Sequence, residues 1–196
     1  MRRILLTFPV VLLAIALWGC TNNTLADNGV FEVELTDREE FLLNTTTDKY
    51  FVFDFQVSNG YKNLSLWVDK YEFGQLVEEE INYLSMNIEK KGTIIFTTSE
   101  IMKNPKEFSF NLSISSNGTF SRGNTQLKMP SMVQSTWGSN PLENNPISDD
   151  MILASICYSN GNGMSSLSKE FYTDLDSHLD EIEGYDVVYV LRSKFH

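Results

Sequence analysis

The amino-acid sequence predicts a mainly β domain, an antiparallel β-sandwich with one late α-helix. Apolar and polar residues alternate most clearly over residues 51–57 and 108–114, as they do in strands that bury one face. An Asn-Gly pair follows each of these segments, at 59–60 and 117–118, and suits the tight turn of an antiparallel hairpin. A small closed β-barrel is the alternative architecture, because it is built from the same strands and turns.

The first strands are expected in residues 30–35 and 51–57. Phe31, Val33 and Leu35 alternate with glutamates in the first segment, and three phenylalanines alternate with Val52, Asp54 and Gln56 in the second. If Asn59-Gly60 forms a two-residue loop, residues 51–57 pair with the segment that follows, with Phe55 opposite Leu64. The sequence therefore predicts a hairpin whose apolar side chains all lie on one face.

The remaining expected strands cover, in chain order, residues 75–88, 94–98, 108–114, 127–133, 151–158 and 187–191. Gly74 and Gly92 indicate turns on either side of the first of these. Pro130 confines the segment 127–133 to a sheet edge or a bulge, because proline has no N–H to donate. Residues 151–158 and 187–191 are predominantly apolar, which is typical of strands that are buried on both faces.

One helix is expected late in the chain. Ser165 or Ser166 can cap its beginning, and Gly184 suits its end. Five apolar residues between them recur at helical spacing: Leu167, Phe171, Leu175, Leu179 and Ile182. We expect this helix to connect the last two strands.

The N-terminus has the order of a secretory signal peptide. Arg2 and Arg3 precede an apolar run, residues 4–17, that is shorter than the ~20 residues of a membrane-spanning helix. Leu17, Gly19 and Cys20 then closely resemble the lipobox of bacterial lipoproteins, with Trp18 standing where a small or aliphatic residue is usual. The resemblance covers residues 1–20 only.

The lipobox resemblance implies cleavage between Gly19 and Cys20 and acylation of Cys20, with palmitate as an expected acyl group. Residues 1–19 are then the signal peptide, 20–29 the acylated cysteine and a flexible tether, and 30–196 a single β-rich domain. The implied location is the extracytoplasmic face of the cell membrane, or an outer membrane if the host has two. The membrane is the partner that this anchor contacts.

Charge and cysteine content narrow the function classes. Loss of residues 1–19 removes two of the 15 basic residues, which leaves 13 against 26 acidic side chains, a net charge of −13. A domain this acidic is poorly suited to binding nucleic acid or to lying flat on an anionic bilayer. Once Cys20 is acylated, Cys157 is the sole remaining thiol, so no intrachain disulfide can form.

Three groups of residues are candidates for a catalytic, metal-binding or phosphate-binding site. Residues 161–166 resemble a phosphate-binding turn between strand and helix, but they lack the Gly-Lys-Ser/Thr sequence. The acidic residues from Asp174 onward offer oxygens to calcium, but an EF-hand needs Gly and Glu where Leu179 and Tyr185 stand.

Cys157 and His178 form a conceivable thiolate–imidazole pair, yet Cys157 lies in an apolar run typical of an inert core residue. We therefore expect no catalytic residues, no metal site and no cofactor.

The remaining candidates are contact residues. Residues 134–150 show no strand or helix periodicity and are expected to form a long loop, in which Trp137 is either an exposed anchor for a partner or packed back onto the sandwich. Trp67 lies on the less apolar face of the expected hairpin, near Tyr50 and Tyr61, where it could stack on a sugar or be covered by other residues.

These observations favour a lipid-anchored envelope protein with a non-enzymatic β-sandwich that contacts another envelope or extracellular protein. The alternative is a small-molecule or glycan-binding module of the cell surface. A third hypothesis, an envelope hydrolase with a pair of carboxylates, has no motif in its favour. The oligomeric state and the partner's identity do not follow from the sequence.

Overall fold

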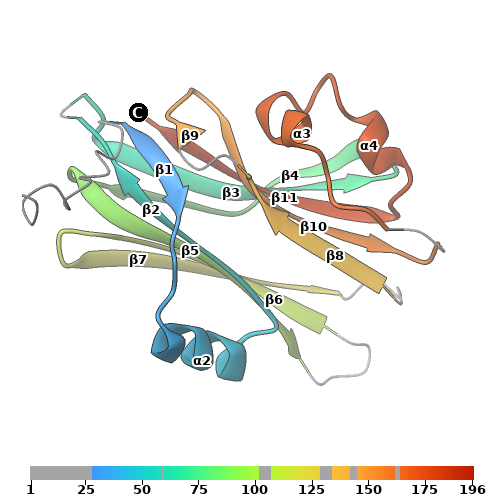
Figure 1. Ribbon diagram of the computed structural model, residues 1–196, viewed down its shortest axis with the longest axis horizontal. Coiled ribbons are helices and arrows are strands. Elements are labelled where there is room, and N and C mark those ends of the chain that lie inside the picture. The colour runs from blue at the N-terminus through green and yellow to red at the C-terminus, as the bar shows by residue number, and fades with distance from the viewer. Residues whose placement is uncertain (1–27, 59, 102–106, 129–133, 142–144, 162–163) are drawn as a thin grey trace, which may run out of the picture.

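The computed structural model describes residues 28–58, 60–101, 107–128, 134–141, 145–161 and 164–196. In this part of the chain two antiparallel sheets pack face to face (Figure 1). The predicted mainly β architecture with two antiparallel sheets is confirmed, and the sheets are not closed into a barrel. The signal peptide, Cys20 and the tether up to residue 27 lie outside the described residues.

The first sheet has six strands in the order β7-β6-β5-β2-β1-β9. Their bounds are Thr119–Lys128, Glu107–Ser116, Lys91–Ile101, Lys49–Gln56, Gly29–Glu32 and Asn145–Pro146, in that order. The second sheet has five strands in the order β4-β3-β11-β10-β8. Their bounds are Gln75–Asn87, Asn63–Glu72, Val187–Phe195, Met151–Ser159 and Gln134–Ser139.

The core between the sheets is filled with apolar side chains. Phe53 and Phe55 of β2 are fully buried against Leu64 and Leu66 of β3, which come from the opposite sheet. Along one side of the sandwich β4 lies beside β7, and the Asn82 side-chain N–H donates to the Phe110 carbonyl over 3.1 Å. This hydrogen bond links the two sheets across that side.

The predicted hairpin between residues 51–57 and 64–68 is wrong. β2 pairs with β1 and β5, whereas β3 pairs with β4 and β11. The chain after Gln56 therefore crosses from one sheet to the other. The alternating pattern correctly identified the buried face of both strands, but two strands that face each other across a core show the same alternation as two strands that pair.

Two hairpin turns form elsewhere. Asn117-Gly118 joins β6 to β7, with φ of 48° and 74°, and Phe73-Gly74 joins β3 to β4, with φ of 49° and 77°. Positive φ at both central residues is the mark of the type I′ turn. The turns expected at Gly74 and Gly118 are thus confirmed. Gly92 is not in a turn but lies within β5.

The strands expected at 75–88, 94–98, 108–114, 151–158 and 187–191 are all present, some of them longer than predicted. Three further strands in the described ranges occupy segments without a clear alternating signal. β7 begins at Thr119, well before the expected segment 127–133, of which residues 129–133 lie outside the described part. β8 and the two-residue β9 lie within residues 134–150, the segment predicted to be a loop.

The helix expected before the last strand is broken into α3 (Lys169–Thr173) and α4 (Asp180–Glu183). Ser168 caps α3, and the Asp174 carboxylate accepts the Ser177 N–H over 3.2 Å, which favours a turn over a continued helix. The apolar stripe is still buried: Phe171 and Ile182 are fully covered against the outer face of the five-stranded sheet. No helix in the described ranges has the length and apolarity that crossing a bilayer requires.

Candidate contact surface at the α2 end

A helix that the sequence analysis missed, α2 (Asp37–Thr46), lies between β1 and β2. Thr36 caps it: the Glu39 N–H donates to Thr36 Oγ1 over 3.4 Å, and the Thr36 N–H donates to Glu39 Oε2 over 2.9 Å. These bonds from Thr36 lower the pKa of the Glu39 carboxyl. Thr-x-x-Glu is a capping box, so this short pattern could have revealed the helix.

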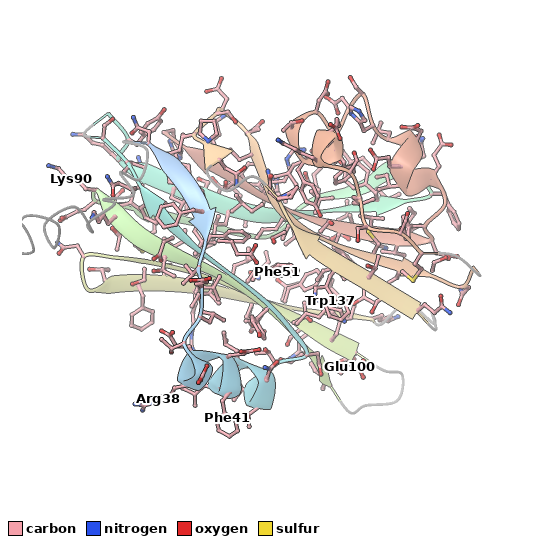
Figure 2. The ribbon with its side chains drawn as sticks, viewed as in Figure 1. Arg38, Phe41, Phe51, Lys90, Glu100 and Trp137 are labelled. Atoms are coloured by element: carbon pink, nitrogen blue, oxygen red, sulfur yellow. The ribbon has the colours of Figure 1, made fainter. Side chains whose placement is uncertain are left out.

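The helix α2 is exposed along its whole length. None of its residues is buried, and Phe41 is 68 % exposed. Figure 2 shows Phe41 and Arg38 directed away from the sheets. Asp37, Glu39 and Glu40 stand in its first turn, where carboxylates are favoured by the helix dipole. Phe41 and Leu42, which is 51 % exposed, are thus two large apolar side chains that the sandwich leaves uncovered.

The end of α2 is held to the end of β5. The Asp48 N–H donates to the Thr98 carbonyl over 2.8 Å, and the Ser99 hydroxyl donates to the Thr46 carbonyl over 3.4 Å. The Glu100 N–H also donates to the Asp48 carboxylate. Backbone and side-chain bonds, rather than apolar packing, therefore position α2.

Trp137 lies at the same end of the molecule. It is on β8 opposite Ile156, a core residue, so its side chain lies on the inner face of the five-stranded sheet at the edge. It is nevertheless 51 % exposed. The sequence left open whether Trp137 is exposed or packed back onto the sandwich; in the structure it is half exposed, and it lies on an edge strand and not in the predicted loop.

Lys49 links Trp137 to the first sheet. Its Nζ lies 4.8 Å from the centroid of the Trp137 ring and 5.8 Å from that of Tyr158, within the range of a cation–π contact. Burial lowers the pKa of Lys49, while Asp48 and Glu100 act in the opposite direction. We call the surface formed by α2, Asp48, Lys49, Glu100 and Trp137 the α2 end.

The second candidate contact residue, Trp67, is not an exposed stacking platform. It is only 9 % exposed and stacks on Tyr83 of β4, with ring centroids 6.3 Å apart and an interplanar angle of 28°. Tyr50 belongs to the other sheet, and Tyr61 packs edge-on against Phe195. The three aromatic residues that the sequence placed together are therefore separated, because the hairpin that would unite them does not form.

The acidic residues of the late segment serve the local fold. Asp174 accepts the Ser177 N–H, and the hydrogen bonds from Ser177 lower the pKa of the Asp174 carboxyl. Glu181 accepts the Ser168 N–H over 2.8 Å. Within the described ranges, no three His, Cys, Asp or Glu side chains are grouped so that they could hold a metal ion.

The two other sequence candidates are also part of the local structure. The Ser165 N–H donates to the Tyr185 hydroxyl over 3.1 Å, and residues 162–163 lie outside the described part. Cys157 is buried as predicted, and desolvation raises the pKa of its thiol to about 12. His178 places Nδ1 2.7 Å from the Asp174 carbonyl oxygen.

Comparison with known proteins adds one finding. No curated protein and no solved structure matches this chain. One family model matches residues 30–195, almost the whole β domain, and it is described as the YgaN domain.

Proposed function

The chain belongs to the YgaN domain family, and we propose that it is a lipid-anchored, non-enzymatic protein of the cell envelope. In this proposal the sandwich contacts another envelope or extracellular protein through the α2 end. The main support for this proposal is the position of α2, an exposed helix with an acidic first turn. It lies far from Asn28, where the anchored N-terminal segment joins the domain.

The lipobox sequence supports the anchor. Leu17, Gly19 and Cys20 stand in the order that precedes acylation. Each buried CH₂ of an acyl chain contributes about 0.8 kcal/mol, and two or more chains hold a protein on a membrane almost permanently. The acylated Cys20 would thus keep the domain on the extracytoplasmic face.

The geometry supports contact at the α2 end. Asn28, the first described residue, accepts the Ser58 N–H over 2.6 Å near the beginning of β5. The α2 end is bonded to the other end of this 11-residue strand, and 11 residues of strand span about 35 Å. The α2 end is therefore the part that an anchored domain presents away from the membrane.

The charges of the α2 end indicate the kind of partner. The α2 end, with its exposed Phe41 and Trp137, also carries five carboxylates: those of Asp37, Glu39, Glu40, Asp48 and Glu100. A partner with an apolar patch and a basic rim is complementary to this surface. The glycan-binding alternative loses support, because Trp67 is buried against Tyr83.

Replacement of Cys20 by alanine tests the anchor. We expect the wild-type protein in the membrane fraction and the Cys20→Ala protein outside that fraction or with its leader uncleaved, because the thiol that carries the acyl chain is gone. Cys157→Ala is the matched control and should leave fractionation unchanged. Unmodified Cys20 in mature wild-type protein, shown by mass spectrometry, would contradict the proposal.

Photo-crosslinking tests the contact. A photoreactive amino acid in place of Phe41 should yield one reproducible protein adduct in cells, and Asp37→Lys with Glu40→Lys, which keeps the Thr36–Glu39 capping box, should abolish it by reversing the charge. The same amino acid in place of Val77, which is exposed on β4 in the other sheet, is the control. Identical adducts from both positions, or lipid adducts alone from position 41, would refute the contact.

A further inference from the structure

Three exposed lysines lie together at the end of the sandwich where the N-terminal segment joins it. Lys62 precedes β3, and Lys90 and Lys91 stand at the beginning of β5. The Val57 N–H donates to the Lys90 carbonyl and the Ile88 N–H to the Lys62 carbonyl, both over 2.8 Å. Since Ser58 is bonded to Asn28, the lysines lie close to the first described residue.

The surface beside these lysines is hollowed. One hollow of about 580 Å³ is bordered by Lys62 and Lys90, and a second of about 560 Å³ shares Asn63, Asn87, Ile88 and Glu89 with it. Most of the shared lining is polar. Two lysines, Lys62 and Lys90, border the first hollow together with Glu89, and clusters of exposed lysines attract anionic headgroups.

An exposed phenylalanine completes this end. Phe120 follows the Asn117-Gly118 turn and is 73 % exposed. The Asn117 side chain donates to the Glu89 carboxylate over 2.6 Å, and the Glu89 N–H donates to the Ser116 hydroxyl over 2.9 Å. These bonds bring the turn that carries Phe120 to the segment that carries Lys90. We call Lys62, Lys90, Lys91 and Phe120 the lysine end.

The lysine end differs in charge from the rest of an acidic chain, whose net charge is −11. Among the described residues its acidic side chains are Glu89 and Asp54, which lines a hollow together with Lys91 and accepts the Thr93 hydroxyl over 2.6 Å. Three lysines against two acidic groups leave a net positive surface. The α2 end, by contrast, carries five carboxylates with Arg38 and Lys49.

We propose that the lysine end binds the anionic headgroups of the membrane that holds the acylated Cys20, so that the sandwich stands end-on. The proposal rests on the lipid anchor proposed above. Asn28 is eight residues after Cys20, and eight residues span at most about 30 Å. The lysine end is thus the part of the domain that the anchor brings nearest to the bilayer, where anionic lipids attract lysines and Phe120 suits the interface. The acidic α2 end is repelled from the same surface.

Fluorescence quenching in vesicles tests this orientation. The acylated full-length protein is inserted into phosphatidylcholine vesicles, with or without phosphatidylglycerol, that contain a lipid with a nitroxide on its headgroup. Because Cys157 is buried and Cys20 is acylated in the proposal, a single introduced cysteine can be labelled selectively. A fluorophore at Thr119→Cys reports on the lysine end, and one at Asn44→Cys reports on the α2 end.

We expect quenching at position 119 and none at position 44 in vesicles with phosphatidylglycerol, and loss of quenching at 119 in high salt. Lys62→Glu with Lys90→Glu and Lys91→Glu should abolish the quenching. The control triple variant Lys128→Glu, Lys169→Glu and Lys194→Glu has the same change of net charge and should retain it. These lysines are exposed, so both variants should fold; circular dichroism checks this.

The outcomes separate the two proposals. If the protein lacks an acyl group on Cys20 and fails to associate with either kind of vesicle, the proposed lipid anchor is refuted. This inference then fails with it. Acylated protein that stays on the vesicles but shows equal quenching at positions 119 and 44 overturns the end-on orientation alone. If the quenching at position 119 persists after Lys62, Lys90 and Lys91 are replaced by glutamate, the three lysines do not hold this end at the membrane.

Discussion

Replacement of Phe110 by alanine is expected to lower the free energy of unfolding by about 4 kcal/mol, because it opens a cavity in a packed core. Phe110 is fully buried on β6. Its ring lies edge-on to Phe96, Phe108 and Tyr189, with centroids 5.2, 4.9 and 4.8 Å away. Tyr189 belongs to the opposite sheet, so the substitution removes packing both within one sheet and between the two sheets.

Urea unfolding of the purified protein, followed by circular dichroism, measures this loss. Phe120→Ala is the matched control, since it removes the same side chain from an exposed position, and it should change the free energy of unfolding by less than about 0.5 kcal/mol. The hydrogen bond from Asn82 goes to the Phe110 backbone carbonyl and is kept in the variant. Equal losses in the two variants would show that Phe110 is not in the core.

Replacement of Gly92 by alanine is expected to cost about 3 kcal/mol, at the upper end of what overpacking in a core usually costs. A Cβ atom at this position would lie 2.1 Å from the Ser115 carbonyl oxygen and 2.4 Å from Cζ of Phe55. The Ser115 carbonyl is backbone of the neighbouring strand β6 and cannot move without disturbing the pairing. Phe55 is buried in the core and has little room to turn.

Gly184→Ala is the control for this prediction. No atom lies within 4 Å of the Cβ position at Gly184, and its φ is −77°. Alanine there should leave the free energy of unfolding within about 0.5 kcal/mol of the wild-type value. The same urea titration compares both variants, and a Gly92→Ala protein as stable as Gly184→Ala would refute the close approach of β5, β6 and Phe55.

Gly92 also shows why a glycine is ambiguous in sequence. The sequence predicts a turn at this position, because glycine is frequent in turns. Its role in the structure is to leave room for the Ser115 carbonyl on the neighbouring strand and for Phe55, which is 37 residues away in the chain. A single sequence offers no means of distinguishing a glycine required by backbone torsion from one required by a neighbour's side chain.

The candidate contact surface was predicted in part. Trp137 was identified because it stands among residues without a core-forming pattern, and it is exposed. The helix α2 was missed, although Thr36 and Glu39 form a recognisable capping box. Trp67 was misplaced because its expected surroundings depended on pairing β2 with β3, which does not occur.

The sequence by itself determined features that depend on neighbouring residues: most of the strand segments, the buried faces of those strands, the turn at Asn117-Gly118 and the burial of Cys157. Each follows from side-chain alternation or local backbone preference. Only the tertiary structure decided which strands pair and which charged side chains lie at the same end of the sandwich. Trp67 lies opposite Arg192, and Lys62 lies near Lys90. Such neighbours are selected by the packing of the whole core, since many partners satisfy the same alternation.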